Sequence, residues 1–168
     1  MRRVADTIGL HPGRADRHPD GAGPDPGTEP TLPDAEHVVA ECVALAATRA
    51  DDPQLPVLVA RYWRLVSDED LLGRSPRSMV AATVSHRELA RQRQRGELRL
   101  TVEPATDNGH TTIEIVTDDM PFLVDSVTAA LTARGLDVRL RVHPVFVVRR
   151  TGLGRFEQLR LDAEPADA

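Results

Sequence analysis

Apolar residues in the first half of the chain recur at helical spacing. Between residues 34 and 95, three stretches repeat apolar side chains at every third or fourth position, as helices with one buried face do. Asp34 is placed to cap the first helix, and the second covers about residues 54–66. Ser75 opens the third helix, which extends to about Gln94. The pattern predicts a helical segment over residues 34–95.

After Gly96 the apolar period changes from helical to alternating. Residues 97–103 and 111–117 each alternate apolar with polar side chains, which is typical of half-buried strands. The Asp-Asn-Gly sequence at residues 107–109 favours a turn, so we expect the two strands to form a hairpin. The apolar side chains predicted to point inward are Leu98, Leu100, Val102, Ile113 and Ile115.

The segment after this hairpin joins a strand to a helix. Asp118 or Asp119 can accept hydrogen bonds from the free N–H groups of the helix start, and Pro121 suits its first turn. The apolar residues that follow have the spacing of a helix packed on a sheet. Gly135 lies where a left-handed C-terminal cap is needed. The sequence therefore predicts a helix that crosses over the sheet.

A long alternation follows, from residue 136 to residue 149. Apolar and polar side chains take opposite faces, and only Pro144 interrupts the pattern. Because proline cannot donate a ladder hydrogen bond, we expect this strand to lie at a sheet edge or to bulge at Pro144. Residues 151–154 favour a turn, and residues 156–161 are expected to form the partner strand.

Together these elements predict an α+β fold. A strand, a crossover helix and a parallel strand form a βαβ unit, which with the next hairpin makes the first half of a ferredoxin-like fold. A second helix and a closing strand do not follow, because the chain after Leu161 is short and polar. We expect four regions: a disordered Gly- and Pro-rich arm at 1–33, a helical lead-in at 34–95, an incomplete βαβ module at 96–161 and a tail at 162–168.

The composition narrows the possible partners. The chain of 168 residues has 21 basic residues, all of them arginine, and 26 acidic residues, for a net charge of −5. The acidic balance and the 3% aromatic content argue against a nucleic-acid partner. No apolar run approaches the ~20 residues of a membrane span, so we expect a cytoplasmic protein without a membrane partner. The single cysteine, Cys42, lies on an apolar helical stripe and is expected to be a buried structural thiol.

Two groups of charged residues suggest binding chemistry, each with a simpler alternative. Arg139 and Arg141 stand two positions apart on one strand face, where they could clamp a carboxylate; the alternative is an exposed charged face. Asp118, Asp119 and Asp125 could gather a divalent cation; the alternative is helix capping and solvation.

The third predicted helix ends in a basic cluster of Arg87, Arg91, Arg93 and Arg95. Cations at this position complement the negative end of the helix dipole, so we expect a solvated face. The alternative is a surface that binds an acidic partner.

A family resemblance is carried by the strand-to-helix junction. The block is Asp118-Asp119-Met120-Pro121-Phe122-Leu123-Val124-Asp125-Ser126-Val127, followed by Arg134-Gly135-Leu136 and Val142-His143-Pro144-Val145. It resembles the N-terminal region of the very large bacterial NAD-specific glutamate dehydrogenases. The helical stretch Arg61-Tyr62-Trp63-Arg64-Leu65-Val66-Ser67 is also similar to that family. The resemblance spans about residues 34–161 and implies an ACT-type regulatory module.

ACT modules often bind amino acids, so the resemblance implies a possible amino-acid effector. The implied ligand-binding positions are Asp118, Asp119, Met120, Pro121 and Phe122, together with Arg139 and Arg141. Amino-acid-binding ACT modules commonly carry glycine after the proline, which lets the backbone approach the ligand. This chain has Phe122 there, whose side chain obstructs that approach. We therefore expect a packing or subunit-contact role at the junction.

The resemblance also implies a parent reaction, the oxidation of L-glutamate to 2-oxoglutarate and ammonia with hydride transfer to NAD. That chemistry needs a nicotinamide-binding fold, usually with a G-x-G-x-x-G turn, and a lysine beside the substrate amine. The chain contains neither a G-x-G-x-x-G sequence nor any lysine. We expect no bound cofactor, no metal and no catalytic residue in this chain, which is predicted to be inactive alone.

The leading hypothesis is therefore a regulatory and assembly region of an NAD-specific glutamate dehydrogenase, lacking the catalytic domain. Its partners would be a second copy of itself or the rest of the dehydrogenase, because an unpaired strand edge and an uncovered sheet face favour association. The alternative is a freestanding ACT-type module that senses amino acids or binds another protein.

Overall fold

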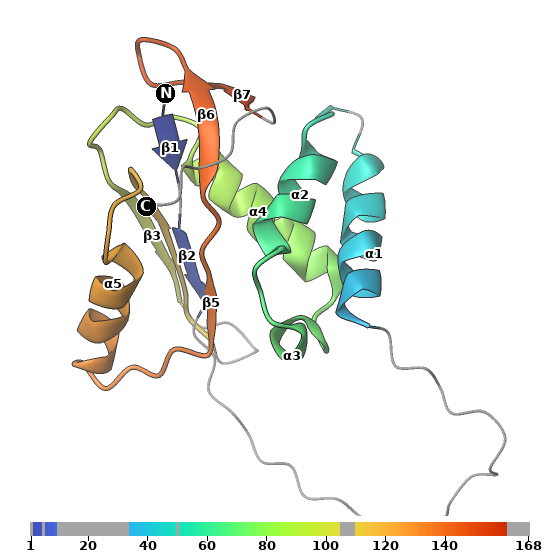
Figure 1. The fold of residues 1–168 in the computed structure, drawn as a ribbon, viewed down its shortest axis with the longest axis horizontal. Coiled ribbons are helices and arrows are strands. Elements are labelled where there is room, and N and C mark those ends of the chain that lie inside the picture. Colours follow the sequence, from blue (N-terminus) through green and yellow to red (C-terminus); the bar gives the residue numbers. More distant parts are fainter. Residues whose placement is uncertain (1, 5, 10–33, 50, 105–109, 161–168) are drawn as a thin grey trace, which may run out of the picture.

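The computed structural model describes residues 2–4, 6–9, 34–49, 51–104 and 110–160. These residues form three layers, with strands between two sets of helices (Figure 1). Helix α5 (Leu123–Thr132) lies on one side of the strands. The other side carries the helices of the first half of the chain, which are α1 (Ala35–Ala47), α2 (Leu55–Trp63), α3 (Asp68–Leu71) and α4 (Pro76–Leu89).

The helices begin where local capping chemistry predicts. The Asp34 side chain accepts a hydrogen bond from the His37 backbone N–H at 2.7 Å. The Ser75 side chain accepts one from the Ser78 N–H at 3.1 Å, and Pro76 follows it in the first turn of α4. These bonds satisfy N–H groups that have no partner within the helix. The predicted helices over residues 34–95 are confirmed, although α4 ends at Leu89 rather than near Gln94.

Helices α1, α2 and α4 share one apolar core with the inner side of the strands. Cys42 is fully buried in it, with its Sγ 3.7 Å from the Sδ of Met79. Burial raises the pKa of the Cys42 thiol, as expected for a structural rather than a reactive cysteine. The other buried helical residues are Ala35, Val38, Ala46, Leu55, Val59, Tyr62, Trp63, Leu71, Met79 and Val80.

A four-stranded antiparallel sheet lies under α5, in the order β3-β4-β2-β5. Its strands are β2 (Asp6–Gly9), β3 (Arg99–Glu103), β4 (Thr112–Val116) and β5 (Leu140–Val142). The predicted hairpin of β3 and β4 is confirmed. Because β4 and β5 both run antiparallel to β2, they are parallel to each other, and α5 connects them. The predicted α+β fold with one crossover helix is therefore present.

The prediction of a disordered arm over residues 1–33 is wrong for residues 2–4 and 6–9. These form β1 (Arg2–Val4) and β2, and β2 fills the place between β4 and β5. A strand from the other end of the chain thus completes the sheet between the two parallel strands. Its backbone pairs on both sides, and local composition does not report such long-range pairing. The rest of the arm, the turn at 107–109 and the tail at 162–168 lie outside the described residues.

Pro144 divides the predicted long strand into two. The chain leaves β5 at Val142 and enters β6 (Phe146–Arg150), which belongs to a second sheet in the order β1-β6-β7. Strand β7 (Phe156–Leu159) pairs antiparallel with β6, as expected for the partner strand. Within the described residues β5 is an edge strand, which fits the position predicted from Pro144.

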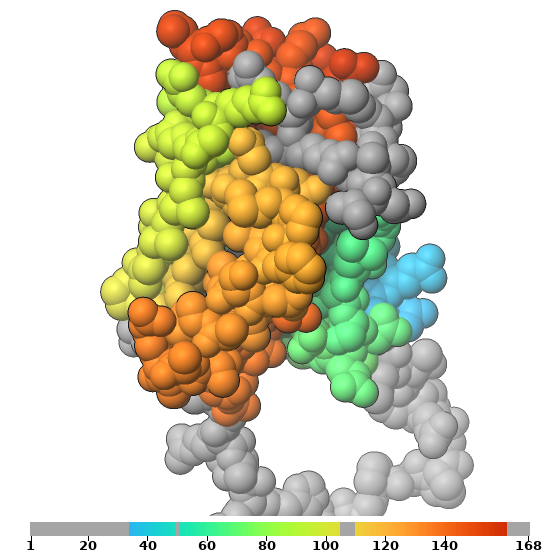
Figure 2. Space-filling model, turned by 60° about the vertical axis from the view of Figure 1, so that its left-hand side comes forward, coloured from blue at the N-terminus to red at the C-terminus, as the bar shows by residue number. Residues whose placement is uncertain are grey.

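The inward face predicted for the hairpin is buried only on β4. Ile115 is 5% exposed, whereas Leu98, Leu100 and Val102 are 57%, 53% and 50% exposed. The register places Leu100 opposite Ile115, so both lie on the face away from α4. Figure 2 shows that α5 covers the centre of this side while the segment of β3 lies beside it. The prediction that all five apolar side chains point into a core is therefore wrong for β3, because α5 is too narrow to reach the edge.

Backbone hydrogen bonds join the residues that follow α4 to the turn between β6 and β7. The Arg93 N–H donates to the Gly154 carbonyl at 3.0 Å, and the Phe156 N–H donates to the Arg91 carbonyl at 2.8 Å. Because these two backbone hydrogen bonds join the chain to the turn, the residues after Leu89 no longer continue the helix. Gly154 has a φ of +86°, and a Cβ there would lie 2.6 Å from the Arg93 carbonyl oxygen. Both the backbone conformation and the close approach require glycine.

A buried polar chain joins α2, α4 and β4. His86 is 3% exposed; its Nε2 lies 3.0 Å from the Ile115 carbonyl and its Nδ1 lies 3.1 Å from the Tyr62 hydroxyl. Because a carbonyl oxygen only accepts, Nε2 carries the proton in neutral His86 and Nδ1 accepts from Tyr62. Burial lowers the pKa of His86 to about 4, against a smaller opposite effect of the Ile115 carbonyl. His86 is therefore neutral in the folded chain at pH 7.

Gly154→Ala is expected to lower the free energy of unfolding by roughly 2 kcal/mol, since alanine is strained at positive φ and its Cβ pushes the turn off α4. Urea unfolding followed by circular dichroism measures the change. Gly152→Ala is the matched control, because no atom lies within 4 Å of its Cβ position. Equal stability of the two variants would show that the contact with Arg93 does not hold the turn.

Acid is expected to destabilise the chain through His86. The folded pKa of about 4 lies below the unfolded value of 6.5, so between these values the unfolded chain binds a proton that the folded chain does not. Lowering the pH from 7 to 5 should therefore cost about 2 kcal/mol at this site. His86→Gln should flatten the pH dependence of urea unfolding by that amount. Exposed His37→Gln should not, and an unchanged slope in His86→Gln would contradict the assignment.

Candidate functional site

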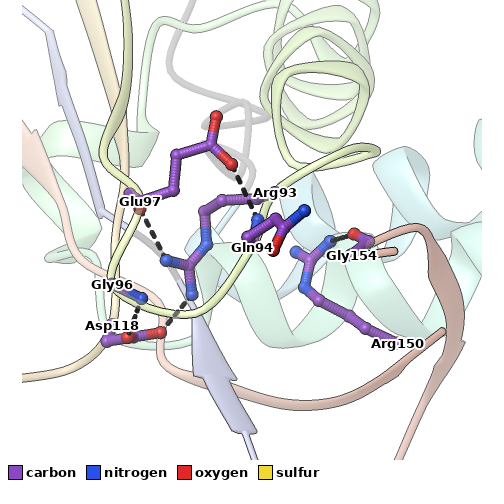
Figure 3. Close-up of polar contacts among 7 residues, drawn as sticks. All are labelled: Arg93, Gln94, Gly96, Glu97, Asp118, Arg150 and Gly154. Atoms are coloured by element: carbon purple, nitrogen blue, oxygen red, sulfur yellow. Dashed lines mark hydrogen bonds and ion pairs between the residues drawn. The ribbon is translucent and has the colours of Figure 1, made fainter. Parts of the chain in front are cut away.

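A buried arginine holds the junction between β4 and α5. The Arg93 side chain is 1% exposed, and its guanidinium donates to the Asp118 carboxylate and, at 2.6 Å, to the Glu97 carbonyl (Figure 3). The Gly96 N–H donates to the other Asp118 oxygen at 2.7 Å. Burial alone would raise the pKa of Asp118, but the hydrogen bonds from Arg93 and Gly96 outweigh it and lower that pKa. The carboxylate is thus held ionised at the end of β4.

The contact with Arg93 overturns the predicted capping of α5 by Asp118. Asp118 is turned toward Arg93, and the residue at the N-cap position is Phe122, which provides no side-chain hydrogen bond. Pro121 precedes the helix instead of lying in its first turn. Phe122 has φ 60° and ψ 12°, and it is the only non-glycine residue with positive φ among the described residues. The chain enters α5 through a strained left-handed residue.

The sequence interpretation missed Arg93 as a buried residue. It treated Arg93 as one of four equivalent arginines on a solvated helix end. In the structure Arg87 pairs with Asp52 and Arg91 lies 3.3 Å from Glu88, while Arg93 lies beyond α4 and turns inward. The only available signal was an acidic residue directly after a strand, which does not identify its partner.

A groove opens at the start of α5. It has a volume of about 440 Å³ and lies between the chain that follows α2 and the α5–β5 side of the sheet. A second groove of about 420 Å³ adjoins it toward α3, and Leu65 and Arg141 line both. The remaining lining residues of the first groove are Met120, Phe122, Leu123, Val124, Asp125 and His143.

The structure brings part of the predicted binding site together. Met120, Phe122 and Arg141 line the first groove, and Arg139 lines the second. Asp118, Asp119 and Pro121 are not among the lining residues. Leu65 was not predicted, because it precedes the junction by more than fifty positions and its sequence context marks only a helix end. Ligand binding at these residues stays a prediction.

The two arginines of the predicted clamp differ in their surroundings. The Nε of Arg139 lies 2.7 Å from the Asp137 carboxylate, which neutralises it. Arg141 is exposed, and its side chain has neither a hydrogen bond nor an ion pair with any residue that the structure describes. Arg141 is therefore the cation of the groove that remains available to a carboxylate.

The three-aspartate cation site that the sequence left open does not assemble. Asp118 is occupied by Arg93 and Gly96, which removes it from the three-aspartate cluster with Asp119 and Asp125. Across the described ranges, no three His, Cys, Asp or Glu side chains come together in a way that could hold a metal ion. A search of the same ranges found no helix with the length and apolar character needed to cross a membrane.

Comparison with known proteins agrees with the junction and the fold. The family model described as "Glutamate dehydrogenase, ACT1 domain" matches residues 58–168. The chain belongs to this family. The match begins within α2, so the helices from there onward are part of the family pattern together with strands β3 to β7, whereas β1 and β2 lie outside it.

A curated relative is much longer than this chain. The NAD-specific glutamate dehydrogenase of Pseudomonas aeruginosa is 29% identical over 113 residues. The matched region covers 64% of this chain but 7% of the relative. No solved structure matches the chain. The resemblance expected from the junction sequence is therefore confirmed, within a small part of a far longer relative.

Proposed function

We propose that this chain is the N-terminal regulatory and assembly region of an NAD-specific glutamate dehydrogenase. The observation that carries the proposal is the ACT1 match over residues 58–168, together with the small share of the relative that it covers. In this proposal the oxidation of L-glutamate to 2-oxoglutarate and ammonia, with NAD, takes place elsewhere in the same cytoplasmic enzyme. The 168 residues contain neither lysine nor a G-x-G-x-x-G sequence, which supports placing the reaction in another part of the enzyme.

The assembly role is supported by the outer edge of β3. In the described sheet β3 is an edge strand, and Leu98, Leu100 and Val102 are each at least half exposed beside it. Unpaired edges with exposed apolar side chains are sites where another strand adds to a sheet. Pairing with a second copy about Thr101 would place Arg99 opposite Glu103 and Leu100 opposite Val102. Such pairing joins opposite charges on one face and covers apolar side chains on the other.

The purified 168-residue chain is expected to produce no NADH from glutamate and NAD, because it lacks the groups that this chemistry needs. Absorbance at the NADH band measures the reaction. In the source cells, an antibody against the chain should detect a polypeptide far larger than 18.4 kDa. Turnover by the purified chain, or a single cellular band at 18.4 kDa, would overturn the proposal.

The β3 edge is expected to bring two copies of the chain together. Sedimentation should show a dimer for the unmodified chain and a monomer for Leu100→Glu, since a charge there is placed within the apolar contact. Leu153→Glu is the matched control, because Leu153 is 77% exposed on the β6–β7 turn. A monomeric unmodified chain, or a dimer that survives Leu100→Glu, would refute association through β3.

A further inference from the structure

We propose that the two adjoining grooves beside α5 form a docking site for an acidic, apolar segment of the parent dehydrogenase. This inference rests on the proposed function, because it takes the occupant from the long remainder of the enzyme. It concerns a different surface from the β3 edge: the grooves lie near β5, the opposite edge strand of the described sheet.

The first argument is the gathering of exposed apolar side chains. Leu65 is 76% exposed, Phe122 is 77% exposed and Met120 is 49% exposed, yet all three line one groove. Single exposed apolar residues are ordinary on a protein surface, but a contiguous group marks an interaction site. These three come from two segments that the fold brings together, so the group is a product of tertiary structure.

The second argument is the conformation of Phe122. Left-handed φ is unfavourable for a bulky side chain, and here it directs a large aromatic ring into solvent. No buried contact within the described residues compensates for that conformation. Strained residues of this kind cluster at binding sites, where a partner supplies the compensating contact. An apolar side chain of the partner against Phe122 would do so.

The third argument is charge. Arg141 lines both grooves and its side chain has no ion pair among the described residues, and Phe122 at the N-cap position of α5 provides no side-chain hydrogen bond to the helix. Both features favour a carboxylate. Two acids also line the grooves: Asp125 in the first, and Asp70 in the second, where the Ser67 hydroxyl donates to it at 2.9 Å. The carboxylate of the partner is therefore expected at Arg141, between the two.

The fourth argument favours a protein segment over a free amino acid. The grooves adjoin across Leu65 and Arg141, and their volumes of about 440 and 420 Å³ together exceed what a single amino acid fills. A peptide segment can lie along both grooves and cover the apolar side chains of the first while it reaches Arg141. A matched region of 7% leaves most of the length of the relative to supply such a segment.

The test is site-specific photo-crosslinking in the full-length polypeptide that carries this chain. p-Benzoylphenylalanine replaces Phe122, which keeps an aromatic ring at that position. After irradiation and proteolysis, mass spectrometry identifies the attached peptide. We expect a peptide from outside residues 1–168 with Asp or Glu next to an apolar residue. The same probe at Leu153, which is 77% exposed and outside both grooves, should give no such product.

Charge reversal tests the role of Arg141. Arg141→Glu should lower the crosslink yield by roughly fivefold or more, because the carboxylate of the partner is then repelled. Arg77→Glu is the control, since Arg77 is exposed on α4 outside both grooves. Equal yields in these two variants would overturn the charge assignment and with it the proposal.

Three other outcomes would also overturn the docking proposal. They are a crosslink within residues 1–168 of a second copy, a yield at Phe122 no higher than at Leu153, and loss of the crosslink on adding free amino acids. None of these outcomes affects the larger cellular band or the inactivity of the isolated chain. The docking site and the proposed function can therefore fail separately.

Discussion

The fold depends on one ion pair, between a buried arginine and a partly exposed aspartate that are far apart in the sequence. Arg93 leaves the end of α4 and meets Asp118 at the end of β4, while its own backbone N–H is bound by Gly154. The helical side, the four-stranded sheet and the β6–β7 turn therefore meet at one arginine (Figure 3). Burying a guanidinium is costly unless its charge and hydrogen bonds are met, so losing Asp118 would leave an uncompensated charge inside the protein. The contact fixes the end of β4, where the chain leaves the sheet toward α5.

The entry to α5 shows how that contact reshapes local structure. An aspartate before a helix ordinarily caps it, and the sequence predicts this for Asp118 or Asp119. Arg93 competes for Asp118, and the helix begins at Leu123, with Phe122 at the N-cap position and no hydrogen bond from its side chain. The strained aromatic residue at this entry is one of the residues that line the candidate groove.

Sequence reasoning succeeded where the determining chemistry is local. The Asp34 and Ser75 caps, the β3–β4 hairpin and the left-handed Gly135 each follow from a few neighbouring residues. It failed where distant segments decide the outcome. The strands within residues 2–9 form only because β4, β5 and β6 offer partners, and Leu98 to Val102 are exposed because α5 is narrow. The candidate site was predicted in part for the same reason: Met120, Phe122 and Arg141 belong to local patterns that suggest binding, whereas the sequence around Leu65 indicates only a helix.

None of the residues of α5 is fully buried, in contrast to the helices on the other side of the sheet. Helix α5 contributes little to the main core, so its detachment costs far less free energy than global unfolding. The protein thus combines well-buried helices on one side of the sheet with a less buried helix, α5, on the other side. A ligand or a neighbouring subunit could therefore shift the position of this helix at a low cost in free energy. A domain that transmits a conformational change to other domains of a large enzyme requires such an element.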